Sequence, residues 1–227
     1  MKLSYSAVLA LGTTTSANHL FVSSCGGNIT TLSLTESNGT MSLESTFFNA
    51  DCRPNPLCLT LNVGRGMLFC LDEGLTAPNG SLGSFTINRD GSLNHVKNET
   101  TISGPVTGVI YGNPAGRRAI GLAPYSGSSV SSYDLDGNGQ FHLSQSFTYS
   151  LTLPGPDADG QDAPHPHEAN LDPAGQYMLV PDLGADLVSA YGIDFNSLNL
   201  TELAPLKAPG GCGPRHAAFY NPTNVAG

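Results

Sequence analysis

The chain has 227 residues, of which 12% are charged, with nine Lys and Arg against 18 Asp and Glu. The formal net charge of −9 argues against a nucleic-acid partner, because such binding needs clustered basic side chains. The abundance of glycine (27) and proline (16) favours many short strands joined by turns over long helices, since these residues suit turn geometries.

Residues 1–17 have the composition of a secretory signal peptide. Lys2 supplies a positive charge, residues 3–12 form an apolar stretch, and Thr15–Ala17 offers small residues for cleavage. We therefore expect a signal peptide over 1–17, one folded domain over 18–227, and a secreted, extracellular or cell-wall location. A first β-strand that follows Lys2 is the alternative. No apolar run is long enough to span a membrane.

Sequons and cysteines agree with a secretory route. Five Asn-x-Ser/Thr sequons predict N-glycosylation at Asn28, Asn38, Asn79, Asn98 and Asn199. An oxidising compartment also suits the five cysteines, which are Cys25, Cys52, Cys58, Cys70 and Cys212. Cys52 and Cys58 bracket a short loop that a disulfide could close, but the pairing cannot be read from the sequence.

Four segments share one plan: an apolar strand, a turn of the form Asn/Asp-x-x-Gly and a second apolar strand. They are Leu59–Glu73, Val109–Tyr125, Ala169–Leu183 and the shorter Ala217–Pro222. Asp172-Pro173-Ala174-Gly175 has the signature of a type I turn, and Asn113–Gly116 repeats it. The segments start roughly 50 to 60 residues apart, which is the period of a propeller blade.

A strand of alternating polarity with a hairpin turn then completes each unit, at Ser81–Leu93, Ser128–Phe141 and Asp186–Leu198. Four antiparallel strands per unit predict an all-β fold, a β-propeller of four-stranded blades. We expect a partial blade over 18–50, fuller blades over 55–104, 105–160 and 164–208, and the opening strands of another. Asp134–Gln145 imitates a calcium-binding loop, but it ends in Gln rather than Glu, and a hairpin turn is the better interpretation.

Two motifs resemble the lactonase-type seven-bladed propellers. They are APHPHEANLDPAGQYMLVPDLGADLVSAYGID at Ala163–Asp194 and GPRHAAFYNP at Gly213–Pro222. That family includes enzymes that close 3-carboxy-cis,cis-muconate into a lactone, and 6-phosphogluconolactonases, which open one. With its sequons and leader, the chain is most similar to secreted fungal glycoproteins that are called carboxymuconate cyclases by similarity. The resemblance implies a ring of seven blades, of which about four are present, so we expect the C-terminal blades to be missing.

The resemblance implies a central cleft in which His167 is one polar group and Arg215 holds a substrate carboxylate, with a His or a Glu as the proton donor. Arginine binds a carboxylate through two parallel hydrogen bonds, and histidine titrates near neutral pH. Weaker candidates for substrate binding are His165, Glu168, Asp182 and His216. A glutamate and a second arginine, which the cyclases carry on later strands, have no counterpart in this sequence.

The implied partner is a small anionic substrate, a carboxylate or a lactone, and no cofactor is implied. His165 and His167 point to the same side of an extended segment. Zinc binding would need a further ligand, and none stands out, while hydrogen bonds to loop carbonyls are a structural alternative. His216 follows Arg215 directly, so we expect it to face the other way. The oligomeric state is not predicted.

The leading hypothesis is a lactone-forming or lactone-hydrolysing enzyme of the carboxymuconate cyclase or 6-phosphogluconolactonase type. The alternative is a catalytically inactive secreted or cell-wall glycoprotein, a surface antigen or adhesin, that retains the propeller scaffold.

Overall fold

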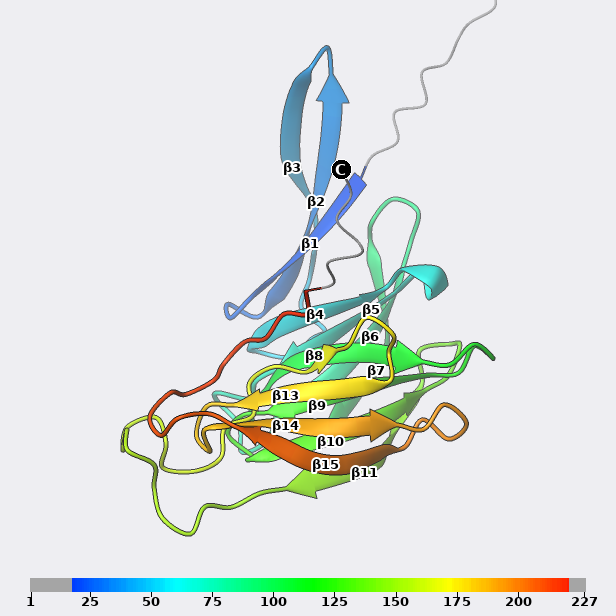
Figure 1. Cartoon of the computed structure of the whole chain (residues 1–227). Coiled ribbons are helices and arrows are strands. Elements are labelled where there is room, and N and C mark those ends of the chain that lie inside the picture. The colour runs from blue at the N-terminus through cyan, green and yellow to red at the C-terminus, as the bar shows by residue number, and fades with distance from the viewer. Residues whose placement is uncertain (1–17, 221–227) are drawn as a thin grey trace, which may run out of the picture.

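A computed structural model describes residues 18–220, which form four antiparallel sheets in chain order (Figure 1). The first sheet has three strands: β1 (Asn18–Ser24), β2 (Asn28–Ser37) and β3 (Thr40–Asn49). The second has four strands and one short 3-10 turn: β4 (Pro56–Asn62), η1 (Val63–Arg65), β5 (Met67–Asp72), β6 (Ser81–Ile87) and β7 (Leu93–Thr100). The third comprises β8 (Pro105–Gly112), β9 (Arg118–Pro124), β10 (Ser129–Leu135) and β11 (Phe141–Thr148). The fourth comprises β12 (Asn170–Leu171), β13 (Tyr177–Asp182), β14 (Leu187–Ile193) and β15 (Leu200–Lys207).

Each sheet is an up-and-down meander in which only sequence neighbours pair. The first strands of the complete sheets lie next to one another, since β8 contacts both β4 and β12. This is the arrangement of propeller blades around an axis. The predicted fold class is confirmed, and the expected units match the sheets, including the partial unit at the N-terminal end.

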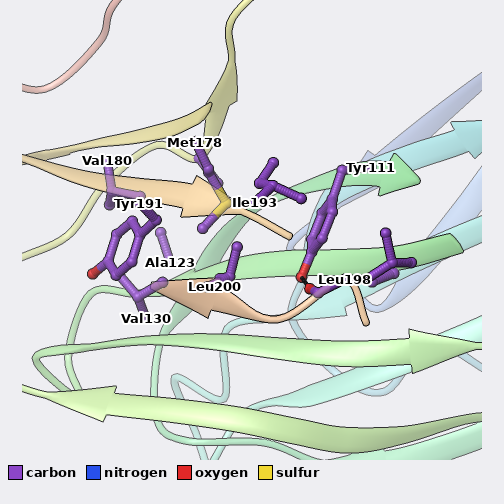
Figure 2. Packing of buried hydrophobic residues seen from close by; sticks show 11 residues of the cluster. Tyr111, Ala123, Val130, Met178, Val180, Tyr191, Ile193, Leu198 and Leu200 are labelled. Atoms are coloured by element: carbon purple, nitrogen blue, oxygen red, sulfur yellow. Dashed lines mark hydrogen bonds between the residues drawn. The ribbon is translucent and has the colours of Figure 1, made fainter. Parts of the chain in front are cut away.

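Apolar side chains fill the space between successive sheets. Tyr111 and Val130 of the third sheet meet Met178 and Tyr191 of the fourth, and all four are buried (Figure 2). Each fully buried large apolar side chain contributes about 1.5–3 kcal/mol to folding. The strand β5 is buried at every position, because its alternate side chains pack on the first and the third sheets.

The Asn/Asp-x-x-Gly segments form the predicted turns. Asp172 accepts backbone hydrogen bonds from Gln176 and Tyr177 at 2.6 and 2.7 Å through Oδ1. The Gly175 amide donates to the Asp172 carbonyl at 2.9 Å, and Gly175 adopts φ +67°. This left-handed conformation is the reason for glycine at the last turn position. Residues 134–145 form the β10–β11 hairpin and its turn.

The cysteine pairing differs from the short loop that the sequence suggested. Cys52 is bonded to Cys70, and both are fully buried between the first and second sheets. Cys58 is a free, half-buried thiol on β4, and burial raises its pKa. Cys58 does not close the short loop with Cys52, because the fold brings the loop after β3 against the middle of β5.

The predicted opening strand at Ala217–Pro222 is not formed as far as the structure describes it, because residues 212–220 contain no strand. The expected signal peptide over 1–17 lies outside the described residues. Within residues 18–220, no helix is long and apolar enough to cross a bilayer.

Candidate active site

In each complete sheet, a proline at or shortly before the start of the first strand lies opposite the last residue of the second strand. The facing pairs are Pro56 with Asp72, Pro105 with Pro124, and Pro166 with Asp182. The residue after each second strand then donates its backbone N–H to the carbonyl just before the proline. These bonds run from Glu73 to Asn55 at 3.1 Å, from Tyr125 to Gly104 at 2.7 Å, and from Leu183 to His165 at 3.1 Å. The three sheets thus share one backbone register at this edge.

This register places matching residues around one cleft of about 710 Å³. The residues that follow the prolines line it: Leu57, Val106 and His167. The donors of the shared hydrogen bond line it too: Glu73, Tyr125 and Leu183. Thr107, Asp157, Gly160, Arg215 and His216 complete the lining. Arg215 follows Pro214, so it continues the series of residues behind a proline.

His167 is held by its backbone and leaves its ring to the cleft. Its N–H donates to the Pro181 carbonyl at 2.9 Å, and its own carbonyl accepts from Thr107 Oγ1 at 3.2 Å. The ring meets Tyr125 edge to face, and the buried Nδ1 has no hydrogen-bond partner among the described residues. Burial lowers the pKa of His167 to about 4, assisted by the charges of Arg215 and His216. The imidazole is therefore neutral at physiological pH.

Arg215 and His216 reach the cleft on the segment that follows β15. Figure 1 shows this red segment running back toward β4, and both residues line the cleft with Leu57 of that strand. Glu168 fixes the segment, since its Oε2 accepts the Ala217 N–H at 2.6 Å. The expectation that His216 faces away was wrong, because these residues are not in a strand and strand alternation does not apply to them.

Asp186 holds an earlier part of the same segment. Its carboxylate accepts the N–H groups of Gly211 and Gly213 at 2.7 and 2.8 Å. Gln161 likewise ties the 157–161 loop to the fourth sheet, since its Nε2 donates to the Leu183 carbonyl at 3.0 Å and its Oε1 accepts the Asp157 N–H at 3.1 Å. Hydrogen bonds of the Asp186 and Gln161 side chains with backbone groups therefore hold these two loops in place at the cleft.

His165 and Asp182 lie behind the cleft rather than in its lining. Both are buried, and Asp182 Oδ1 accepts the N–H groups of His165 and Ala185 at 2.6 and 3.0 Å. Burial raises the pKa of the Asp182 carboxyl. This placement agrees with an organising role for Asp182 in the loop after β13, and it gives His165 contacts within the protein.

Two cleft residues, Glu73 and Tyr125, were not among the predicted candidates. Burial, together with the neighbouring charge of Asp72, raises the pKa of the Glu73 carboxyl. The signal for them was present in the repeat, because Glu73, Tyr125 and Leu183 each end one of the aligned segments. Among residues 18–220, no three or more His, Cys, Asp or Glu side chains lie close enough together to hold a metal ion.

Comparison with known proteins gives consistent matches. The profile of the family described as "Lactonase, 7-bladed beta-propeller" matches residues 8–226. A probable 6-phosphogluconolactonase of Arthroderma benhamiae is 32% identical over 203 residues, which cover 89% of this chain and 49% of the relative. A 6-phosphogluconolactonase of Yersinia pestis is 34% identical over 119 residues, 48% of this chain and 35% of that protein. The chain thus spans about half or less of the curated relatives it matches.

Solved structures match the fold. A putative 6-phosphogluconolactonase of Bacteroides fragilis superimposes with a TM-score of 0.77 at 22% identity, over 92% of this chain and 60% of the other. A periplasmic gluconolactonase of Pseudomonas aeruginosa gives a TM-score of 0.66 at 22% identity, over 87% and 56%. The family profile covers nearly the whole chain. The chain belongs to the lactonase family of seven-bladed β-propellers.

Proposed function

We propose that the protein hydrolyses a small lactone bound in the cleft between His167, Arg215 and Glu73. The observation that carries the proposal is the pairing of a neutral, half-buried imidazole with a guanidinium in one cleft. Membership of the lactonase family supports it, as do the 6-phosphogluconolactonase names of the relatives.

Ring opening needs two proton transfers. In our mechanism, the neutral His167 ring removes a proton from water as the water oxygen attacks the lactone carbonyl carbon. The bond between the carbonyl carbon and the ring oxygen then breaks, and the ring oxygen takes a proton from the Glu73 carboxyl. The product is the open hydroxy acid. The two protein groups exchange their protons through solvent before the next turnover.

One cationic side chain of the cleft, Arg215, suits an anionic substrate, although Glu73 and Asp157 also line the cleft. Arg215 presents a planar guanidinium, which binds phosphate or carboxylate through paired hydrogen bonds. His216 beside it also lines the cleft. A sugar-acid lactone with a phosphate or carboxylate on the far end fits this arrangement, and 6-phosphogluconolactone is the first candidate.

Cyclisation of a muconate is the alternative reaction for the same site. Closing the lactone requires a proton on carbon, and a His167 ring that is neutral above pH about 4 is a poor donor. Glu73 would have to supply that proton. Both reactions would therefore take a proton from Glu73, and they differ in whether His167 must accept a proton from water.

A secreted, non-catalytic glycoprotein is the second candidate. The observation that favours it is the exposure of the sequon residues Asn38 and Asn199 in turns between strands. Both asparagines stand clear of the cleft lining, so sugar at these sites is compatible with either function.

One set of assays separates these functions. The full chain is incubated with 6-phosphoglucono-δ-lactone, glucono-δ-lactone and 3-carboxy-cis,cis-muconate, and acid release or muconate absorbance is followed. We expect hydrolysis of the phosphorylated lactone above that of the plain one, and its loss in His167→Ala without a change of melting temperature. Closure of muconate instead would identify a cyclase. A chain that accelerates no reaction over buffer would support the non-catalytic glycoprotein.

A further inference from the structure

The buried histidine of the HPH motif is tied into a chain of contacts that ends at the cleft. His165 Nε2 lies 2.9 Å from Asp162 Oδ1, and His165 Nδ1 lies 3.1 Å from the Tyr125 carbonyl oxygen. The His165 ring stacks on the Tyr125 ring with centroids 4.2 Å apart and an interplanar angle of 11°. The Tyr125 ring in turn meets His167 edge to face, with centroids 5.8 Å apart at 88°.

Both partners of the His165 ring are acceptors. A backbone carbonyl has no proton to give, and an ionised carboxylate accepts only. The hydrogen bond from His165 lowers the pKa of Asp162, which keeps that carboxylate ionised. Two good hydrogen bonds therefore require a proton on each ring nitrogen, so the arrangement selects the imidazolium. A neutral ring would leave one nitrogen lone pair facing an oxygen lone pair.

The remaining groups around the ring agree with this assignment. Asp182, the other acid nearby, uses Oδ1 to accept backbone N–H groups and so contributes negative charge without taking a ring proton. Gly184 packs so closely that an added Cβ would lie 1.7 Å from the Ala163 oxygen and 2.9 Å from His165 Cδ2. The ring is thus held on its edges as well as its face, and it has little freedom to turn.

We propose that His165 is a positioning residue of the cleft, a charged imidazolium clamped between Asp162 and Tyr125 that fixes the Tyr125 ring against His167. A cation stacked on an aromatic face is attractive, and the Tyr125 ring then limits the rotation of the His167 ring. The imidazolium also adds a positive charge behind a cleft that receives an anion. The proposal rests on the proposed function only for its effect on turnover, not for the protonation state.

Nitrogen-15 NMR of the histidine side chains tests the protonation state without any substrate. In the wild-type chain near neutral pH, we expect one histidine with two protonated ring nitrogens and slow exchange. In Asp162→Asn that signal should shift toward a neutral tautomer, and the His167 resonances should broaden. The matched control is His142→Gln, which removes an exposed histidine 3.6 Å from Asp134 on another strand and should leave these signals unchanged.

Turnover of the lactone provides the second measurement. His165→Gln and Asp162→Asn should lower kcat about tenfold with little change in KM. Asp162 is largely exposed, so Asp162→Asn decides the matter if His165→Gln does not fold. A neutral His165 ring at pH 7 would overturn the proposal. So would an Asp162→Asn variant whose histidine nitrogen-15 signals and kcat equal those of the wild type. A wild-type chain that opens no lactone would refute the proposed function, while the NMR result would still decide the role of His165.

Discussion

The imidazole rings of His167 and His216 meet edge to face with centroids 5.1 Å apart, although one precedes β12 and the other follows β15. Arg215 lines the same cleft. Positive charges at such short range oppose one another, because each raises the free energy of the next protonated form. His167 is therefore protonated only under acid conditions.

Burial of the His167 ring, assisted by the charges of Arg215 and His216, makes the stability of the fold depend on pH. The pKa of His167 falls from 6.5 to about 4 on folding, so between these values the unfolded chain binds more protons than the folded chain. The contribution of His167 to the free energy of unfolding is complete above pH 6.5, and it decreases as the pH falls toward 4. We expect urea midpoints of wild type to drop across this window more than those of His167→Asn. Equal pH slopes for the two proteins would contradict the assignment, and His142→Asn provides the exposed-histidine control.

Replacing Arg215 tests the anion subsite. Arg215→Ala should raise KM for a phosphorylated lactone about 100-fold, since a paired guanidinium–phosphate contact is lost. Arg215→Lys should recover part of that loss, because it restores the charge but not the planar fork. Arg89→Ala, at an exposed turn between β6 and β7, should behave as wild type. An unchanged KM in Arg215→Ala would place the anion elsewhere.

Glu73 is expected to supply a proton to the leaving ring oxygen. Glu73→Gln keeps the shape of the side chain and should lower kcat about 100-fold at constant KM, whereas Glu73→Asp should retain part of the activity. The control is Glu44→Gln on the exposed face of β3. Steady-state kinetics with the best lactone substrate makes the comparison, and wild-type kcat in Glu73→Gln would remove Glu73 from the mechanism.

The disulfide should be a major source of stability for the first two sheets. Cys52–Cys70 closes a loop with a sequence separation of 18, which corresponds to about 3 kcal/mol in the loop-entropy account. Cys52→Ala should lower the free energy of unfolding by that amount, measured in urea. Cys25→Ser, which changes an exposed free thiol, should have no effect. Alkylation of native protein should label Cys25 and Cys212 before Cys58.

The sequons should differ in glycan occupancy. Asn98 Nδ2 donates to the Asp51 carbonyl at 2.7 Å, and its Oδ1 is buried, so a sugar on this nitrogen would break the contact. Asn38 and Asn199 are exposed in turns. After expression through a secretory host, peptide mass spectrometry should find sugar at these two and not at Asn98. Occupied Asn98 in folded protein would contradict the packing described for β7.

Much of the fold follows from local sequence patterns. The turn Asp172–Gly175 and its counterpart Asn113–Gly116 mark the strand ends, because their side-chain caps and left-handed glycine are local requirements. The pairing of Cys52 could not be derived in this way, since it depends on how two sheets pack. His216 was misplaced for a related reason: alternation holds within a strand, and the segment after β15 is fixed by Glu168 and Asp186 instead.

The site was predictable only in part. His167 and Arg215 could be named from their motifs, and the structure brings both to one cleft, while their roles stay predictions. Glu73 and Tyr125 carry no motif of their own. Their position is visible only when the blades are compared with one another, because a shared backbone register rather than a residue type marks it.

The shared backbone register of the three complete sheets shapes the cleft without fixing which side chains line it. The hydrogen bonds that set it are made by backbone atoms, so they do not depend on which side chain follows each proline. At two of these positions, Leu57 and Val106, the present side chains are apolar and take no part in the proposed reaction. A polar residue at either place would alter what the cleft accepts while the blade beneath it stays intact. Leu57 and Val106 therefore offer two separate places at which substrate preference can be redesigned.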